Sequence, residues 1–231
     1  MQAIILAGGL ATRMHPRTLT MAKAMLLVAG RPFIDWQLEK LKSHGYDDIV
    51  LCVAFLGEQI KDHVGDGARH GLRVRYSDEG PTLLGTAGAL RVALPLLDPA
   101  FLVTYGDSYL PFDYSAPLTV LTLHDDCDGV MSVFPNRGLW DASNVKTDGV
   151  HVLAYEKGTT DPSFDHIDYG ALALRRSLVA AIPEGVKAGL EEIQTRLARA
   201  GRMRAVVAAE RFYEIGSPEG LLALDARLGS V

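Results

Sequence analysis

The chain has 231 residues, of which 48% are hydrophobic and 22% charged, a composition typical of a soluble globular protein with enough length to bury a sizeable core. Its formal net charge of -5 provides no overall attraction for nucleic acid or an anionic membrane, so we expect neither as a partner. An anionic ligand would therefore need a local cluster of cations and backbone N–H groups.

Cysteine spacing argues against a metal or redox protein, and the N-terminal pattern and segment lengths argue against a secreted or membrane protein. Cys52 and Cys127 lack the spacing of a metal site or redox motif, and Cys52 lies in an apolar run, where we expect a small buried hydrophobe. The N-terminus lacks the pattern of a secretory signal, and no segment has the length of a transmembrane helix. We therefore expect a cytoplasmic protein.

The first half of the chain alternates strand and helix patterns. The apolar run over 3–7 ends at Gly8-Gly9, which predicts a strand buried on both faces and followed by a loop. From Pro32, apolar residues at helical spacing predict a helix that ends at His44-Gly45. The pattern then predicts a strand over 49–55, a helix over 58–64, an extended segment over 72–76, a helix over 85–97 and a strand over 101–105 that ends at Gly106-Asp107.

The second half continues this organisation without a linker or an internal repeat. We expect strands over 129–134, 150–155 and 170–174, and helices over 190–200 and 218–228. Such alternation predicts a mostly parallel sheet covered by helices on both faces. Ligands of such sheets bind beyond the carboxyl ends of the strands, which is where Gly8-Gly9 and Gly106-Asp107 fall.

The segment after the first predicted strand has the residues of a phosphate loop. Gly8 and Gly9 provide flexible backbone, Thr12 a hydroxyl and Arg13 a guanidinium, so the loop can surround phosphate oxygens. By itself, a Gly-Gly turn is equally typical of an ordinary turn from a strand into a loop. A second cation, Lys23, follows in a nearly uncharged stretch, and two cations near one loop suit a triphosphate.

Two acids can supply the ligands of a Mg²⁺ ion that bridges phosphate oxygens. Asp107 follows the strand over 101–105 and would project at the same edge of the sheet as Gly8-Gly9. Glu214 is flanked by aromatic residues and precedes a turn into a helix. Taken individually, Asp107 would be a turn residue or a helix N-cap, and Glu214 a surface acid.

These motifs, in this order, resemble the sugar-phosphate nucleotidyltransferase family over essentially the whole chain. The family's Gly-Gly, Thr-Arg and Pro-Lys-Pro pattern is similar to residues 8–14 with 22–24, and its Gly-Asp metal motif matches 106–107. Its Glu-Lys pair matches 156–157, and its aromatic-x-Asp-x-Gly-Thr-Pro element is similar to 212–218. Short bacterial members that activate heptose 1-phosphate or N-acetylmuramic acid 1-phosphate show the greatest similarity.

The resemblance implies an α/β, Rossmann-like three-layer fold with a mostly parallel mixed central sheet. It implies one domain over residues 1–231, with a nucleotide-binding part over about 1–110 and a sugar-binding part over about 111–231. It also implies an enzyme that transfers a nucleoside monophosphate from an NTP to a sugar 1-phosphate, with Mg²⁺ as cofactor and an NDP-sugar and pyrophosphate as products.

The resemblance assigns roles to individual residues. Arg13, Lys23 and Asp107 would be catalytic, and Asp107 and Glu214 would hold the metal. Contacts to the nucleotide would come from Leu6, Ala7, Gly8, Gly9, Thr12, Arg13, Gly85, Thr86 and Gly106. Contacts to the sugar phosphate would come from Asn144, Glu156, Lys157, Asp168, Tyr169 and Gly170.

Several of these residues have structural alternatives. The segment around Thr86 is also typical of the N-cap of the following helix, and its glycines would let a nucleobase approach the backbone. Glu156-Lys157 can be an exposed pair at a strand end, and Tyr169 can belong to the core. We favour a structural role for His166, because an ionised phosphate needs no general base.

Four residues depart from the family pattern. Ala11 replaces a loop glycine where the backbone needs a positive φ, and Glu214 replaces the usual Asp. Ala22 and Ala24 replace two prolines, which should loosen Lys23 in the unbound state.

The substrates and the functional class have alternatives. Our preferred pair is GTP with a heptose or hexose 1-phosphate, although the motifs themselves specify neither the base nor the sugar. A cytidylyltransferase acting on phosphocholine or a similar phosphorylated alcohol would have the same fold. A catalytically silent nucleotide-sensing domain would explain the changes at Ala11, Ala22 and Ala24. The sequence sets no expectation for the oligomeric state.

Overall fold

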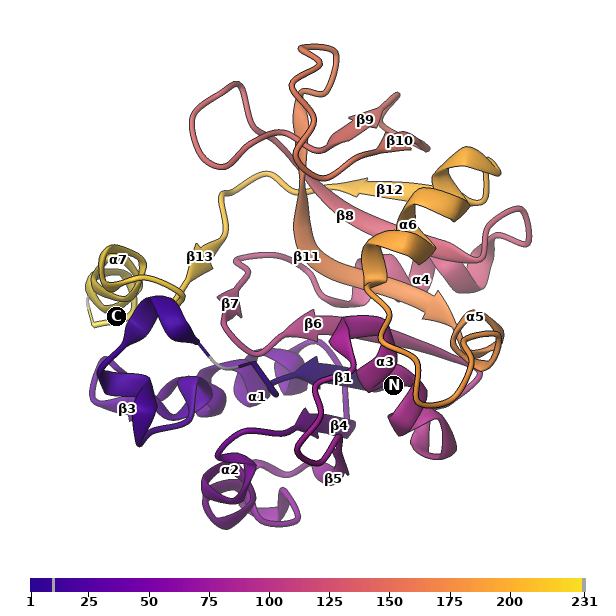
Figure 1. Cartoon of the computed structure of the whole chain (residues 1–231). Helices are drawn as coiled ribbons and strands as arrows, with labels where there is room; N and C mark the ends of the chain where they lie inside the picture. The colour runs from indigo at the N-terminus through magenta and orange to yellow at the C-terminus, as the bar shows by residue number, and fades with distance from the viewer. Residues whose placement is uncertain (10, 230–231) are drawn as a thin grey trace.

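The computed structural model describes residues 1–9 and 11–229, so Leu10 of the predicted phosphate loop lies outside the described residues. A central sheet organises the described chain (Figure 1). Its parallel part has the order β5–β4–β1–β6. These strands are β1 (Gln2–Leu6), β4 (Asp48–Val53), β5 (Arg73–Asp78) and β6 (Ala100–Tyr105).

The order of these strands contains a topological switch point. β1 pairs in parallel with β4 on one side and with β6 on the other, so the chain builds the sheet outward in both directions from β1. The connections that follow β1 and β4 lie on one face of the sheet, whereas the connection from β5 to β6 crosses the other face. The carboxyl ends of β1 and β6 lie side by side at this switch point. A crevice opens between these two ends, and in open α/β sheets this is where ligands bind.

The second half of the chain extends the same sheet. β11 (His166–Arg175) is antiparallel to β6 and to β8 (Gly129–Pro135), and β12 (Met203–Val207) runs parallel to β8. The antiparallel pair β9 (Val145–Thr147) and β10 (Val152–Tyr155) joins through β9, which pairs with the start of β11. The predicted mixed α/β fold is confirmed. The shared sheet supports the single domain, which stays a prediction.

Helices cover both faces of the sheet. One face carries α1 (Phe33–Ser43), α2 (Gly57–Val64) and α4 (Ser115–Leu123), and the other carries α3 (Gly85–Ala93), α5 (Arg176–Ala180) and α6 (Leu190–Arg199). Alternate residues of β1 explain why residues 3–6 are all apolar, since Ala3 and Ile5 pack on the first face and Ile4 on the second. Burial of each such isoleucine stabilises the fold by about 1.5–3 kcal/mol.

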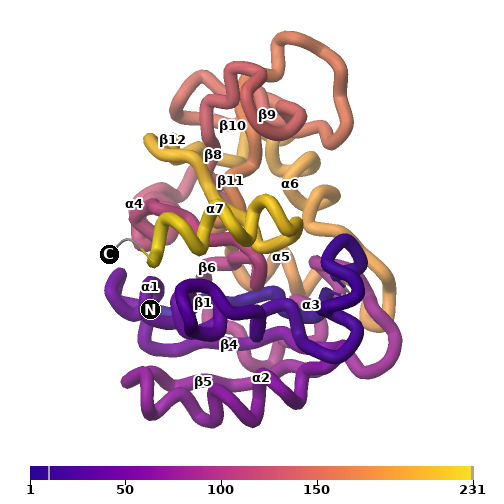
Figure 2. Tube along the Cα trace, turned by 90° about the vertical axis from the view of Figure 1, so that its left-hand side faces the viewer, coloured from indigo at the N-terminus to yellow at the C-terminus, as the bar shows by residue number. Residues whose placement is uncertain are grey.

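The C-terminal helix packs against the N-terminal segment, as the yellow and indigo tubes show in Figure 2. α7 (Pro218–Leu228) begins after Ser217, whose hydroxyl accepts a hydrogen bond from the Gly220 amide at 3.1 Å. Its Leu224 and Leu228 join Met14 and Phe33 in a third hydrophobic cluster. This cluster ties the segment after the predicted phosphate loop to the end of the chain.

The remaining short elements were not predicted. They are the hairpin β2 (Leu27–Val28) and β3 (Arg31–Pro32), the pair β7 (Ser108–Tyr109) and β13 (Tyr213–Glu214), and the 3₁₀ turns η1 (Thr12–Met14), η2 (Arg17–Leu19), η3 (Lys23–Met25), η4 (Ala68–His70) and η5 (Leu94–Leu96). Two-residue strands carry no periodicity that a sequence pattern can reveal.

Some predicted boundaries differ from the structure. The helix predicted over 85–97 ends as an α-helix at Ala93 and continues as η5, because Pro95 has no N–H to donate. The strand predicted over 170–174 begins already at His166. Sequence patterns missed α4, which has apolar residues on every side. No helix in the described ranges has both the length and the apolarity needed to cross a membrane.

Candidate functional site

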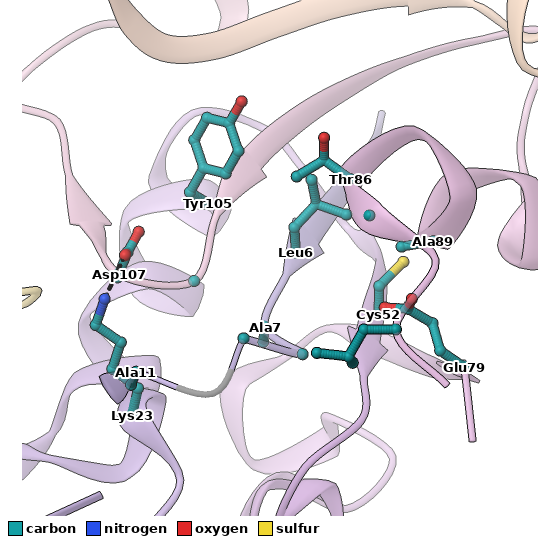
Figure 3. A pocket seen from close by; sticks show the side chains of 15 residues that line it. Leu6, Ala7, Ala11, Lys23, Cys52, Glu79, Thr86, Ala89, Tyr105 and Asp107 are labelled. Atoms are coloured by element: carbon teal, nitrogen blue, oxygen red, sulfur yellow. Dashed lines mark hydrogen bonds and ion pairs between the residues drawn. The ribbon is translucent and has the colours of Figure 1, made fainter. Parts of the chain in front are cut away.

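A cavity of about 250 Å³ lies beyond the carboxyl ends of β1 and β6 (Figure 3). It is lined by Leu6, Ala7, Gly8, Gly9, Ala11, Lys23, Cys52, Glu79, Leu83, Gly85, Thr86, Ala89, Tyr105, Gly106 and Asp107. The structure thus brings together most residues predicted to contact a nucleotide. Thr12 and Arg13 are exposed and are not among the lining residues.

The ends of β1 and β6 approach each other closely at this cavity. The Gly106 amide donates to the Leu6 carbonyl at 2.9 Å, and a Cβ on Gly106 would lie 2.9 Å from the Cα of Ala7. Only glycine fits such an approach. Gly106 therefore allows Asp107 to leave β6 beside the first loop.

A charged pair occupies one end of the cavity. Lys23 Nζ lies 2.5 Å from Asp107 Oδ2, and their side chains are only 15% and 29% exposed. Figure 3 shows Lys23 reaching from its own segment to the aspartate at the end of β6. Because the pair is partly shielded from water, its attraction is stronger than that of a surface ion pair.

The segment that carries Lys23 is held without the prolines of the family pattern. Gln59 of α2 accepts a hydrogen bond from the Ala22 amide and donates one to the Thr20 carbonyl, each at 2.8 Å. Ala22 and Ala24 are 4% and 2% exposed and pack in the core. The expected loosening of Lys23 finds no support, because packing and Gln59 brace the segment instead.

A glutamine that the sequence analysis missed holds the turn that carries Asp107. Gln37 of α1 donates from Nε2 to the carbonyls of Tyr105 at 2.7 Å and Ser108 at 3.0 Å. Its side chain is 2% exposed, so these bonds form away from water. One side chain thereby clamps the backbone on both sides of Asp107.

Glu214 reaches Asp107 through strand pairing. In the β7–β13 pair Glu214 lies opposite Ser108, and the Ile215 amide donates to the Asp107 carbonyl at 2.9 Å. Burial and then the negative charge of Asp107 raise the pKa of Glu214, whereas Lys23 lowers it. The raised pKa marks two carboxylates close enough to repel each other.

Arg13 joins this group of charges. A Cβ on Gly216 would lie 3.2 Å from Arg13 Nη2 and 3.3 Å from Lys23 Nζ. It would lie 3.6 Å from Glu214 Oε2. Two cations and a carboxylate therefore surround Gly216, and Asp107 is paired with one of the cations.

Ala11 adopts the left-handed conformation that the sequence analysis expected at this position, with φ 51° and ψ 41°. Its carbonyl accepts hydrogen bonds from the Thr18 hydroxyl at 2.8 Å and the Met14 amide at 3.0 Å. A side chain in this conformation costs about 1–2 kcal/mol, which these local bonds offset in part.

The opposite end of the cavity carries Glu79, a second residue that the sequence analysis missed. Its Oε2 accepts a hydrogen bond from the Leu84 amide at 2.9 Å, and burial raises its pKa. A Cβ on Gly8 would lie 3.2 Å from its other oxygen. The position of Glu79, just after the strand over 73–78 at the same sheet edge, was the signal that could have identified it.

The glycine-rich segment at the start of α3 packs against the segment that precedes α6. A Cβ on Gly85 would lie 2.6 Å from the Ala188 carbonyl oxygen, which accepts hydrogen bonds from the amides of Ala87 and Gly88. The Thr86 hydroxyl accepts from the Leu190 amide at 2.8 Å, so it caps α6 and not α3. The room that Gly85 leaves is used by the segment before α6.

Three of the six residues predicted for the sugar phosphate, Asn144, Asp168 and Gly170, form a second polar group. Asp168 accepts hydrogen bonds from Gln194 at 2.7 Å and the Gly170 amide at 3.0 Å, and its own amide donates to Asn144 at 2.9 Å. Burial raises the pKa of Asp168, and Lys157 lowers it. Gln194 of α6 was not predicted from the sequence.

Tyr169 does not belong to this group, because its side chain lies in the core, and its sugar contact stays a prediction. The residue is 1% exposed, and its ring packs against those of Phe112, Phe134 and Phe212 with centroids 5.5–6.1 Å apart. Neighbouring residues of a strand point to opposite faces, so the polar placement of Asp168 sends Tyr169 into the core.

Glu156 and Lys157 are exposed at the end of β10. His166 lies 2.6 Å from the exposed Asp165, an arrangement in line with a structural role.

The residues at Asp107 fit a magnesium ion. Mg²⁺ usually binds proteins through one or two carboxylates and keeps water and substrate phosphates as its other ligands. Asp107 and Glu214 provide such a pair, and their mutual repulsion favours a cation between them. Among the described residues there is no group of three or more His, Cys, Asp or Glu side chains that would form a fully protein-bound site.

Comparison with known proteins gives matches along the chain. The family model described as nucleotidyl transferase matches residues 2–136. The N-acetylmuramate alpha-1-phosphate uridylyltransferase of Neisseria meningitidis is 46% identical over 117 residues, 50% of this chain and 51% of that protein. The mannose-1-phosphate guanylyltransferase of Mycobacterium tuberculosis is 29% identical over 98% of this chain and 64% of that protein.

A solved structure has a similar fold. HddC from Yersinia pseudotuberculosis superposes with a TM-score of 0.79 at 25% identity, covering 98% of this chain and 99% of that one. HddC has also been solved in complex with GMP-PN. The chain spans about half of the length of the Neisseria relative, 51%, so its whole activity does not follow from that likeness.

Replacement of Gln37 by leucine should destabilise the protein and loosen the turn at Asp107. The Tyr105 and Ser108 carbonyls lose their buried donor, which should lower the free energy of unfolding by about 2 kcal/mol or more. Chemical denaturation measures this loss, and hydrogen exchange at the Gly106 and Ile215 amides measures the loosening. Gln59→Leu is the comparison variant. Hydrogen exchange at the Gly106 and Ile215 amides should be slower in Gln59→Leu than in Gln37→Leu.

Replacement of Glu214 by glutamine should stabilise the protein in EDTA at neutral pH. Because folding raises the pKa of Glu214 above its ordinary value of 4.5, the stability from its protonated form is complete below 4.5 and is lost as pH rises through the raised pKa. We expect a gain of about 1 kcal/mol, or about 2–4 °C in Tm, at pH 7.

This gain should disappear as the pH falls to about 4, where wild-type Glu214 is protonated too. The exposed Glu219 at the start of α7 provides a control, because Glu219→Gln should not raise Tm. An equal or lower Tm of Glu214→Gln across this pH range would contradict the electrostatic account.

Proposed function

The chain belongs to the nucleotidyl transferase family, and on this basis we propose that it transfers a nucleoside monophosphate from an NTP to a sugar 1-phosphate. The products are an NDP-sugar and pyrophosphate. The names of the Neisseria and Mycobacterium relatives, which describe transfer to sugar 1-phosphates, support this reaction.

The observation that carries the proposal is the meeting of four charged side chains at the switch point. Lys23 pairs with Asp107, and Arg13 and Glu214 lie around Gly216 beside them. Both substrates of the proposed reaction are polyanions, so the site must offset their repulsion. A cluster of two cations and two carboxylates suits this task when the carboxylates hold a metal ion.

In the proposed reaction, a phosphate oxygen of the sugar 1-phosphate attacks the α-phosphorus of the NTP. A new P–O bond forms, the bond between the α-phosphorus and its bridging oxygen breaks, and pyrophosphate leaves with the electron pair. Arg13 and Lys23 would bind oxygens of the triphosphate, and the backbone at Gly8 and Gly9 would contact its phosphates. The contribution of these residues is positioning and charge stabilisation.

We propose Mg²⁺ as the metal that Asp107 and Glu214 would hold. The ion would neutralise negative charge on the phosphates as the bond to the α-phosphorus forms. Glu214 is longer by one methylene than the Asp of the family pattern, and its strand position opposite Ser108, the residue after Asp107, supports its role as the second ligand.

The sugar would bind near Asp168. The Gly170 amide and the Gln194 side chain donate to its carboxylate, and Asn144 accepts from its backbone amide. A carboxylate fixed in this way suits hydroxyl groups of a sugar. Tyr105 lines the nucleotide cavity, and burial and then the charge of Asp168 raise its pKa, so the Asp168 carboxylate acts electrostatically on a residue of that cavity. We keep Glu156 and Lys157 as sugar-phosphate contacts on the strength of their motif.

No observation favours the two alternatives. The assembled charges and the braced Lys23 speak against a silent nucleotide-sensing domain. A cytidylyltransferase acting on phosphocholine has no support from the relatives, whose names specify sugar phosphates.

We further propose GTP as the preferred nucleotide, because Glu79 supplies a carboxylate at the end of the cavity opposite Lys23 (Figure 3). Guanine carries N–H donors at N1 and N2 on one edge, and a carboxylate accepts such a pair. Uracil and thymine offer a single N–H between two carbonyls, which a carboxylate repels. The complex of HddC with GMP-PN, a nucleotide that carries guanine, supports this choice.

The proposed reaction predicts pyrophosphate release that requires Mg²⁺, an NTP and a sugar 1-phosphate together. Asp107→Asn should lower kcat on the order of 10²-fold or more, because it removes a metal ligand and the partner of Lys23. A coupled pyrophosphate assay with a panel of NTPs and sugar 1-phosphates measures both effects.

The exposed Asp62 of α2 supplies the matched control, since Asp62→Asn should retain wild-type turnover. Full activity of Asp107→Asn would refute the metal assignment. Nucleotide binding without any product across the panel would favour the nucleotide-sensing domain.

The base proposal predicts that Glu79→Gln changes nucleotide preference. The ratio of kcat/KM for GTP to that for UTP should fall about tenfold or more, since an amide pairs less well with two N–H donors. Steady-state kinetics with both nucleotides and one sugar 1-phosphate provide the test. A wild-type enzyme that prefers UTP would exclude guanine selection by Glu79.

A further inference from the structure

A second cavity of about 300 Å³ lies beside the candidate metal site. It opens between the loop after β8, the strand β13 and the start of α7, and none of the residues given for it lines the nucleotide cavity. It is lined by Leu139, Trp140, Asp141, Arg211, Phe212, Tyr213, Glu214, Ser217, Gly220 and Ala223. Since Asp107 lines the first cavity and Glu214 the second, the two carboxylates stand where the cavities meet.

The loop that forms one wall is built to hold its shape. Asn136 at its base is 2% exposed, and its side chain accepts a hydrogen bond from the Trp140 amide at 3.1 Å and donates to the Ser143 hydroxyl at 3.0 Å. The next residue, Arg137, has a φ of 50°, a conformation that a side chain adopts only when its surroundings impose it. This internal framework holds Trp140 over the cavity with 51% of its surface exposed.

Arg211 is the exceptional residue of this cavity. Its guanidinium carbon lies 4.5 Å from the centre of the Trp140 ring and 4.1 Å from the centre of the Tyr213 ring. Within the described residues it makes neither a hydrogen bond nor an ion pair. Two aromatic faces thus fix the guanidinium while leaving its N–H donors unused by the protein.

A neighbouring arginine, Arg227, has a structural role and provides a comparison for Arg211. Arg227 of α7 also stacks on the Tyr213 ring, at 5.2 Å, but its guanidinium bonds to Glu210 at 3.0 Å. Its charge is therefore compensated inside the protein. Arg211 has the same aromatic support without a carboxylate, and five N–H donors in a planar fork are suited to an oxyanion.

We propose that Trp140, Arg211 and Tyr213 form a subsite for an oxyanion of the acceptor substrate. This inference rests on the proposed transferase function. The oxyanion is a phosphate or a carboxylate, either the 1-phosphate of the sugar or a second anionic group on the sugar ring. Arg211 binds its oxygens, and the exposed face of Trp140 packs against apolar C–H groups of the sugar.

Two carboxylates in the cavity determine on which side of it the anion binds. Asp141 and Glu214 line the same cavity, and Asp141 contributes to the raised pKa of Glu214. They repel an anion from their side, so the oxyanion sits against Arg211 and sugar hydroxyls face Asp141. The arrangement selects an acceptor that carries negative charge at one position and hydroxyl donors at another.

Anion binding can be tested without turnover through the fluorescence of Trp140. The chain has two tryptophans, so Trp36→Phe leaves Trp140 as the only reporter. Titration of this variant with inorganic phosphate should change the emission saturably, because the anion draws the guanidinium from the indole ring. Adding Arg211→Gln should abolish the change, whereas Arg227→Gln should retain it.

A response that persists in Arg211→Gln, or no response in the Trp36→Phe parent, overturns the subsite. This readout does not depend on catalysis. A saturable Arg211-dependent signal in a protein that forms no product would leave the subsite standing and refute the proposed transferase function instead.

Kinetics then distinguish the two sources of the oxyanion. Arg211→Gln should raise KM for the acceptor on the order of tenfold to 100-fold and leave KM for the NTP unchanged. An equal rise for glucose 1-phosphate and glucose 1,6-bisphosphate identifies the 1-phosphate as the bound group. A rise confined to glucose 1,6-bisphosphate or glucuronic acid 1-phosphate identifies a second anionic substituent, and unchanged acceptor KM values overturn the proposal.

Discussion

The parallel pairing of β1 with both β4 and β6 is the constraint on which the candidate site depends. It sets the carboxyl ends of β1 and β6 side by side, and the Gly106 amide bonds directly to the Leu6 carbonyl. The first loop and the Asp107 turn therefore share one crevice. A glycine is needed at 106 because any side chain there would meet Ala7. The remaining site elements attach to this junction from other parts of the chain.

Those attachments are made by buried polar side chains and short strands. Gln37 clamps the backbone around Asp107, and Gln59 does the same for the segment of Lys23. The β7–β13 pair brings Glu214 beside Asp107, and α7 packs against the segment after the first loop. These contacts fix positions before any substrate binds, which is what the proposed reaction between two polyanions requires. This preorganisation holds the carboxylates of Asp107 and Glu214 close together, and their repulsion is electrostatically unfavourable.

The two cavities divide the chemistry of the site. Lys23 and Asp107 lie at one end of the first cavity and Glu79 at the other, so a nucleotide can be bound by its phosphates and its base. The second cavity places an uncompensated guanidinium on the far side of Glu214. An acceptor held there would meet the nucleotide at the two carboxylates. Asp168 and its hydrogen-bonded neighbours supply a further polar surface on β11.

The sequence by itself determined the α/β class, most helices and strands, and the loop, cation and carboxylate residues at Gly8, Lys23 and Asp107. These features are local: strand and helix periodicity, glycines at strand ends and motif spacing all lie within short segments. Only the tertiary structure decided that Tyr169 belongs to the core, that Gln59 replaces the bracing prolines, and that Gln37, Glu79 and Arg211 join the site. Their partners lie far away in the chain, and a side chain's role depends on which distant backbone or ring it meets after folding.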